Sequence, residues 1–523
     1  MNSLSAASPL LLALTLAFSA SACGGTAPAP LGPLHVDMPA GGPSPAKPKL
    51  ALSSRERPPG ASSSKESPFP KVARQTLKNG LGVAVVEAHA LPIVQLRVIV
   101  RAGSGYGATP GAAELTAQLL KDGGTRTMPS AELLRRVETL GADLGVRVDF
   151  DSTVLSIAVP KDHLAEALAL LGEVVTQPRL DDGELKKLKG RATDQAEDNA
   201  RSNGKWTATR LMFRELYTSQ NPYANYDLVP SEIAKVLPAT VKDFHKRFYV
   251  PKNATVVIAG DVSPNAAHEL AQKVFGGWIG GDAPKVQFPA TIALSKRHVI
   301  VAHRPKSVQS DVFIAGLGPT RNSPDWPQIR VANQIMGGGV AGRLFLDVRE
   351  QRSLAYSAYS RVVELAHAEQ PVVLYAGTET AKTGLAAQGL IDNLEKIATA
   401  GVTAQETETA RRYLSDVFAI RMETIGSIAD MVVEADALSL PDGYWDSYRT
   451  AVRAIDAQQA GAAATKLFHA DRSVLVVAGD ADQIAPMLAR FGDVTVVDPE
   501  QEFKTVKTIP ENKDAPLGAG TTK

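Results

Sequence analysis

Hydrophobic residues along this chain follow two patterns. Short, nearly continuous apolar runs at residues 81–86, 93–100, 298–302 and 309–316 are typical of buried strands. Segments with apolar residues three and four positions apart predict amphipathic helices. Because the strands come in pairs and the helices in blocks, we expect an α+β fold with largely antiparallel sheets. The predicted helices cover residues 111–120, 130–140, 162–176, 182–199, 205–217, 266–275, 385–398, 404–422 and 481–491.

Two distant segments of the chain share one pattern. Residues 248–261 and 467–480, 219 positions apart, each contain a helix end, a turn, a buried strand and a final Ala-Gly-Asp. The strand pairs that open the two halves correspond more loosely. The common order of elements predicts an internal duplication, with one domain at about 71–280 and a second at about 290–500. Residues 501–523 are then a tail.

The first seventy residues differ in composition from this body. Residues 10–22 form a short apolar run that ends in small residues, which is typical of a signal peptide at residues 1–22. Residues 23–70 are rich in Pro, Ala, Gly and Ser, a composition that cannot form a core, so we expect a disordered linker there.

Cys23 is the only cysteine in the chain and directly follows the apolar run. Its surroundings, Ala-Ser-Ala before and Gly-Gly after, resemble a bacterial lipoprotein cleavage box, which implies lipidation of Cys23. We therefore expect export to the bacterial cell envelope, with the body facing the periplasm from a lipid anchor, at the outer membrane. An ordinary signal peptide cut nearby is the alternative.

The charge balance argues against one class of partner. Lys and Arg number 56 and Asp and Glu 55, giving a formal net charge of +1. Such an even balance offers no electrostatic reason to expect nucleic acid as a ligand.

The helix predicted at residues 111–120 holds the first candidate chemistry. Glu114 and Gln118 stand four residues apart and share a face with Ala117, while leucines cover the opposite side. In this setting the stretch resembles the opening helix of the insulinase/pitrilysin family of zinc peptidases, of the mitochondrial-processing-peptidase-like type. The family pattern there is Gly-x-Ala-His-x-x-Glu-His-x-Leu.

This sequence keeps the spacing of the family motif but lacks its zinc-binding histidines and its general base. Glu114, Ala117 and Gln118 stand where the family has its first His, its general-base Glu and its second His. A neutral amide is a poor zinc ligand, and Ala117 has no atom that could accept a proton. In the family, about seventy-six residues separate the second His from the third zinc ligand. The same gap counted from Gln118 leads to Gln195. We therefore expect no metal in this chain and a solvated carboxylate at Glu114.

A second constellation lies in the second domain. Residues 334–357 are similar to the family segment in which an Arg and a Tyr, seven residues apart, bind the substrate backbone and the developing oxyanion. The matching residues are Arg349 and Tyr356, whose side chains are donors suited to a peptide carbonyl. Ser353 departs from the pattern, which usually has Gly there.

The resemblance also implies that the catalytic and substrate-binding residues lie on two different chains. Some members of the family are heterodimers, in which one chain carries the zinc motif and a partner with a degenerate motif carries the Arg/Tyr pair. This chain is then expected to be the non-catalytic subunit, half of a clamshell built from two homologous sheet-and-helix domains. Its partner would be a homologous zinc-motif peptidase chain, and its substrate peptides or unfolded protein.

Two other functions fit the same sequence. One is a stand-alone envelope scaffold or peptide-binding lipoprotein, which would pair with a second copy of itself and have no proteolytic role. The other is an atypical metalloenzyme that uses Glu114 and a carboxylate near Gln195.

Overall fold

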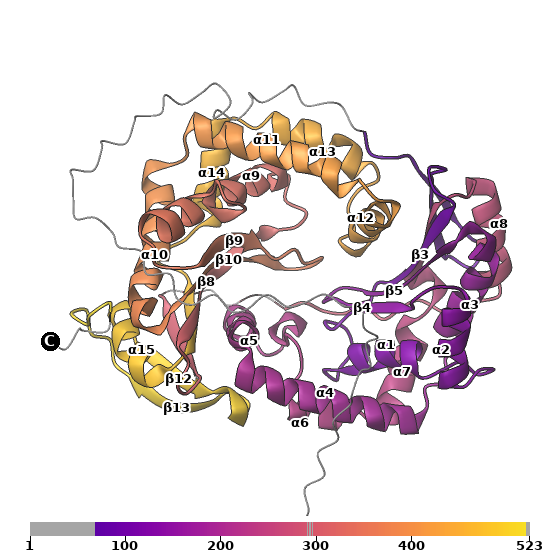
Figure 1. Cartoon of the computed structure of the whole chain (residues 1–523), viewed down its shortest axis with the longest axis horizontal. Helices are drawn as coiled ribbons and strands as arrows, with labels where there is room; N and C mark the ends of the chain where they lie inside the picture. The colour runs from indigo at the N-terminus through magenta and orange to yellow at the C-terminus, as the bar shows by residue number, and fades with distance from the viewer. Residues whose placement is uncertain (1–67, 290, 292–293, 295, 519–523) are drawn as a thin grey trace, which may run out of the picture. The chain divides into compact units, whose positions relative to one another are not determined.

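The computed structural model describes residues 68–289, 291, 294 and 296–518. The predicted signal peptide, Cys23 and nearly all of the predicted linker lie outside this range. The described strands form two sheets, each with helices packed against it (Figure 1). The first contains β1 (Val72–Thr76), β2 (Gly82–Glu87), β3 (Ile93–Val100), β4 (Gly145–Val148), β5 (Thr153–Pro160) and β6 (Ala254–Gly260), and the second β7 (His298–His303), β8 (Gln309–Thr320), β9 (Ser357–Val362), β10 (Glu369–Glu379), β11 (Val474–Gly479), β12 (Val494–Asp498) and β13 (Lys504–Ile509).

The sheet topology confirms the duplication. The strand order β2-β6-β3-β5-β4 in the first sheet returns as β7-β11-β8-β10-β9 in the second. In both sheets the first of these pairs is parallel and the next three are antiparallel. The sheets differ at one side, where β1 pairs antiparallel with β2, while β12 pairs parallel with β7. The prediction of largely antiparallel sheets is correct.

The predicted helices are confirmed, with shifts of a few residues at their ends. Helices that the sequence did not single out fill the segments between them. In chain order the α-helices of the described residues, predicted and additional together, are α1 (Ala112–Asp122), α2 (Ser130–Thr139), α3 (Leu164–Thr176), α4 (Asp182–Ser202), α5 (Gly204–Leu216), α6 (Pro230–Lys235), α7 (Pro238–Phe248), α8 (Pro264–Phe275), α9 (Trp326–Gly337), α10 (Thr383–Ala400), α11 (Ala404–Arg421), α12 (Ile425–Ala437), α13 (Tyr444–Arg453), α14 (Ala457–Leu467) and α15 (Ala481–Leu488).

Both faces of the central strands are buried, which explains their continuous apolar runs. In β8, Val312 and Ile314 pack with the helices of the second half, whereas Phe313 and Ala315 pack on the other side with residues of α5. The first sheet is covered in the same way. Its outer face meets α3 and α8, and its other face meets α12 from the second half of the chain (Figure 1). Each half therefore supplies a helix to the core of the other.

The last strand corrects the predicted domain boundary. The sequence assigned residues 501–523 to a tail, but β13 lies there and pairs antiparallel with β12. Most of its six residues are exposed, so β13 has no apolar face from which a strand could be predicted. None of the helices in the described part of the chain combines the length and apolar character needed to cross a membrane.

Candidate functional site

Helix α1 begins at a glycine that the backbone requires. Gly111 has a φ of +88°, and a Cβ there would lie 3.1 Å from side-chain atoms of both Leu228 and Val236. Along the helix, Leu115 and Leu119 are buried in the core of the first half, as the sequence predicted. Ala117 is fully buried, so its position offers only a methyl group to its surroundings.

Glu114 is not the solvated carboxylate that the sequence suggested. Its side chain is partly exposed, but its Oε2 atom is buried and has no hydrogen-bond partner. Burial, together with the smaller effect of the nearby charges of Asp227 and Glu232, raises the pKa of Glu114 to about 7, and a hydrogen bond from its own backbone N–H partly opposes this rise. The prediction failed because residues more than a hundred positions away cover this helix face.

Replacing Glu114 by glutamine is expected to stabilise the folded chain in alkaline solution. The carboxyl loses its proton near pH 4.5 when unfolded but near pH 7 when folded, so the folded state binds more protons between these values. Stability of the wild type therefore falls as the pH rises through this window. We expect Glu114→Gln to raise the free energy of unfolding by about 2 kcal/mol at about pH 8 and to leave it unchanged near pH 4.

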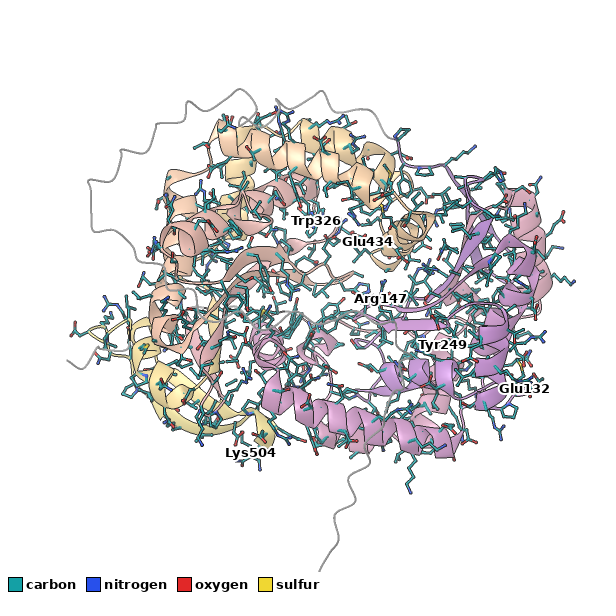
Figure 2. All side chains as sticks on the ribbon, viewed as in Figure 1. Glu132, Arg147, Tyr249, Trp326, Glu434 and Lys504 are labelled. Atoms are coloured by element: carbon teal, nitrogen blue, oxygen red, sulfur yellow. The ribbon has the colours of Figure 1, made fainter. Side chains whose placement is uncertain are left out.

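Urea unfolding at both pH values measures this effect. The matched control is Glu132→Gln on α2, where the carboxylate is about half exposed (Figure 2). Equal stability of the Glu114→Gln variant and the wild type at pH 8 would contradict the buried position of this carboxylate.

The other zinc-motif positions also fail to supply ligands. Gln195 lies on the exposed side of α4, where its Nε2 donates a hydrogen bond to Asn199 Oδ1 at 3.3 Å. The neighbouring Ala196 is buried, so the side of α4 that faces the protein carries a methyl group at this point. Gln118 contributes a neutral amide. Across the described residues, no three His, Cys, Asp or Glu side chains are grouped in a way that could hold a metal ion. The residues present do not fit the family's zinc.

Glu114 lines a cavity of about 880 Å³ whose walls come from both halves of the chain. The first half contributes β4 with the loop that follows it, and the second half contributes α12 and residues 363–365. Arg147 of β4 and Glu434 of α12 mark two of these walls in Figure 2. Among the described residues, seven carboxylate side chains and two arginines line the cavity. It is thus acidic, and burial raises the pKa of Glu434 as well as that of Glu114.

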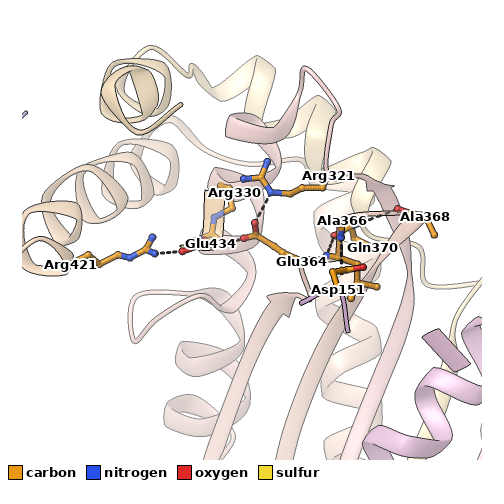
Figure 3. Close-up of polar contacts among 10 residues, drawn as sticks. Asp151, Arg321, Arg330, Glu364, Ala366, Ala368, Gln370, Arg421 and Glu434 are labelled. Carbon is orange, nitrogen blue, oxygen red and sulfur yellow. Dashed lines mark hydrogen bonds and ion pairs between the residues drawn. The ribbon is translucent and has the colours of Figure 1, made fainter. Parts of the chain in front are cut away.

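Most of these carboxylates already have partners (Figure 3). Glu364 accepts hydrogen bonds from Arg321 Nε at 2.7 Å and Arg330 Nη1 at 2.8 Å, and Arg421 Nη2 donates to Glu434 at 2.8 Å. Asp151 accepts from the backbone N–H of Ala366 at 2.8 Å. No local sequence pattern marks this network, because its members are spread over nearly three hundred positions.

Asp151 joins the two halves. Besides the N–H of Ala366, its carboxylate accepts a hydrogen bond from the Tyr223 hydroxyl at 2.5 Å, and that hydroxyl also accepts from the N–H of His367 at 3.1 Å. Burial raises the pKa of Asp151. The loop between β9 and β10 is therefore held against the first half by polar contacts that little water reaches.

Arg349 lies in a π-helical segment, η5 (Phe345–Gln351). Its side chain is 44% exposed, its guanidinium is 4.6 Å from the ring centre of Phe345, and its Nε is 3.6 Å from Glu350. A neighbouring glutamate that is itself exposed neutralises this charge only weakly. Shortly after it, Ser353 has a φ of +50°, which explains why glycine suits that position.

Tyr356 lies over Gly377 of β10. Its side chain is 55% exposed, and a Cβ at Gly377 would lie 2.9 Å from its hydroxyl oxygen and 2.6 Å from that of Tyr375. Tyr375 in turn donates to Asp311 Oδ1 at 2.7 Å. Burial, Asp311 and Tyr356 together raise the pKa of Tyr375. Tyr375, Asp311 and Gly377 were not predicted, because their only signal in the sequence is polar or small residues inside two strands.

The two sets of sequence-predicted residues occupy different places. Glu114 lines the acidic cavity, whereas neither Arg349 nor Tyr356 is among the residues that line it.

Comparison with known proteins identifies the family of this chain. The family model described as "Insulinase (Peptidase family M16)" matches residues 82–221, and the model described as "Peptidase M16 inactive domain" matches residues 236–414. This chain belongs to the insulinase family. Because Glu114, Ala117 and Gln118 replace the catalytic motif, it is a degenerate, non-catalytic M16 member.

Individual M16 proteins resemble most of the described chain. The zinc protease PqqE of Helicobacter pylori is 23% identical over 73% of this chain and 88% of its own length. From the same organism, the non-peptidase homolog YmxG is 24% identical over 68% of this chain and 82% of its own length.

Solved structures of M16 proteins confirm the fold class. A peptidase M16 inactive domain from Pseudomonas fluorescens has a TM-score of 0.72 and 27% identity, covering 78% of this chain and 98% of that one. The first half of the periplasmic protease PqqL from Escherichia coli has a TM-score of 0.64 and 17% identity, covering 80% and 95%. The expected fold, α+β with two sheet-and-helix domains that form half of a clamshell, is therefore correct.

Proposed function

We propose that this M16 member is the non-catalytic subunit of a two-chain zinc peptidase. Its partner would be a homologous chain with an intact His-x-x-Glu-His motif, which alone holds the zinc. The observation that carries the proposal is the contrast between two sites. The zinc-motif helix has lost its ligands, whereas Arg349 and Tyr356 are retained with their side chains 44% and 55% exposed.

The chemistry of the retained pair suits a peptide. The Arg349 guanidinium and the Tyr356 hydroxyl can both donate to a peptide carbonyl, and more strongly to the oxyanion that forms on it. The Arg349 guanidinium lies over the Phe345 ring, and the Tyr356 ring lies over Gly377, where the absence of a Cβ leaves room for it. Donors held in place before the substrate arrives lose little entropy on binding.

The peptide in this proposal binds at the edge of a sheet. Strand β4 is an edge of the first sheet, so one side of its backbone has no strand partner, and Arg147 and Val148 line the acidic cavity. An extended peptide can add to such an edge through main-chain hydrogen bonds. We propose that peptides or segments of unfolded protein bind there as an added strand, in the cell envelope, with Cys23 as the lipid anchor.

The test is to mix the purified chain with a zinc-motif M16 chain from the same genome and to follow cleavage of a quenched fluorescent peptide. We expect neither chain alone to cleave it, and the equimolar mixture to cleave it in a chelator-sensitive reaction. Full activity of the zinc-motif chain alone would contradict the proposal and favour a stand-alone scaffold or peptide-binding protein.

A further inference from the structure

A second hollow in the first half of the chain has the opposite charge to the acidic cavity. It measures about 1130 Å³ and lies where α3, α7 and α8 end. The described residues that line it include no Asp or Glu. We call it the basic hollow, after the side chains that line it: Arg126, Arg179, Lys242, His245 and Lys246.

Part of this charge is not neutralised by the protein. Arg179 and Lys242 form ion pairs with Asp181 at 3.6 Å and Asp182 at 2.7 Å. Arg126 and Lys246 are exposed and form no ion pair with any described residue. The basic hollow therefore holds two cations whose only counter-ions come from solution.

Interaction with a helix end explains the position of only one of these two cations. Lys246 lies in the last turn of α7, where a positive charge offsets the partial negative charge of the helix end. Arg126 lies between α1 and α2, outside any helix. It is close enough to His245 to lower the pKa of that imidazole, although burial is the larger cause. Arg126 lines the basic hollow and forms no ion pair with any described residue there.

The rim of the basic hollow is apolar. Trp278 and Ile279 follow α8 and line it, and Ile279 is 93% exposed, the most exposed large hydrophobic side chain among the described residues. Trp278 is itself buried, so of these two residues only Ile279 is exposed, and an exposed apolar side chain beside cations suits the interface of an anionic membrane.

We propose that the basic hollow binds a phosphate group, through Arg126 and Lys246. An arginine fork matches two phosphate oxygens, and a lysine adds a point charge. The phosphate belongs either to an anionic lipid headgroup, with Ile279 in the interface, or to a soluble phosphate compound. This site is independent of the proposed peptidase role, because none of its residues lines the acidic cavity.

The test uses the full chain with Cys23→Ser, so that an acyl group cannot itself cause membrane binding. One arm measures binding of inorganic phosphate by calorimetry. The other measures sedimentation with phosphatidylglycerol vesicles, with phosphatidylcholine vesicles as the neutral reference. We expect binding in at least one arm, weakened about tenfold or more by Arg126→Gln with Lys246→Gln and reduced by added salt.

The matched control carries Arg135→Gln with Lys187→Gln, the same loss of charge at exposed positions on α2 and α4. It should bind like the unaltered chain. Loss of vesicle binding on Ile279→Ser, with phosphate binding unchanged, identifies a lipid headgroup, and phosphate binding without vesicle binding identifies a soluble ligand. Absence of binding in both arms, or equal binding by the double variant and the control, would overturn the proposal.

Discussion

Replacing Arg349 by alanine is expected to lower the kcat of the two-chain peptidase by about 100-fold or more. In the proposed role the guanidinium donates to a carbonyl oxygen that gains negative charge during the reaction, so its contribution is larger in the transition state than in the bound substrate. The KM should change less than kcat. Steady-state cleavage of a fluorescent peptide by the mixed chains, at a fixed concentration of the zinc-motif partner, measures both constants.

Three further variants show whether the effect belongs to Arg349 itself. Arg412→Ala removes an arginine of similar exposure, 46%, from α11 and should leave kcat unchanged. Arg349→Lys keeps the charge without the planar fork and should recover part of the activity. Tyr356→Phe removes only the hydroxyl and should also reduce kcat. An Arg349→Ala mixture as active as the wild type would rule out this role.

Replacing Glu364 by alanine is expected to lower the free energy of unfolding by about 3–5 kcal/mol. Glu364 accepts hydrogen bonds from Arg321 and Arg330, and the Arg321 side chain is only 3% exposed. Removing the carboxylate leaves a buried guanidinium without its ion-pair partner, beside the rings of Trp326 and Tyr444 at 4.5 and 5.0 Å. Those ring contacts offset only part of the lost ion pair.

Urea unfolding at neutral pH measures this difference. The matched control is Glu500→Ala, which removes a 54% exposed carboxylate that pairs with Arg201 at 3.5 Å and should cost about 0–1 kcal/mol. A Glu364→Ala variant as stable as this control would show that the network around Arg321 does not hold this part of the second half together.

The sequence was most informative where the pattern is local. The run at residues 93–100 is strand β3 at the same residues, and the helix expected at 111–120 is α1. The repeat at residues 248–261 and 467–480 reappears as β6 and β11 at equivalent places in the two sheets. In each case neighbouring residues decide the structure, through strand or helix periodicity.

Burial of polar groups depends on distant residues and could not be predicted in this way. Glu114 lies on the helix face that the sequence indicated, yet Asp227 and Glu232 alter its protonation from more than a hundred positions away. Asp151 similarly accepts from Ala366 in the other half. The positions of Arg349 and Tyr356 were found only because a family pattern marks them, and their substrate-binding role remains a prediction.

Zinc content, measured by elemental analysis together with peptide cleavage on the purified full chain carrying Cys23→Ser, tests most directly whether this M16 member is non-catalytic. The positions of Glu114, Ala117, Gln118 and Gln195 predict no bound zinc after dialysis and no chelator-sensitive cleavage by the chain alone. One zinc per chain with chelator-sensitive cleavage, both lost in Glu114→Ala, would contradict this and make the chain an enzyme in its own right.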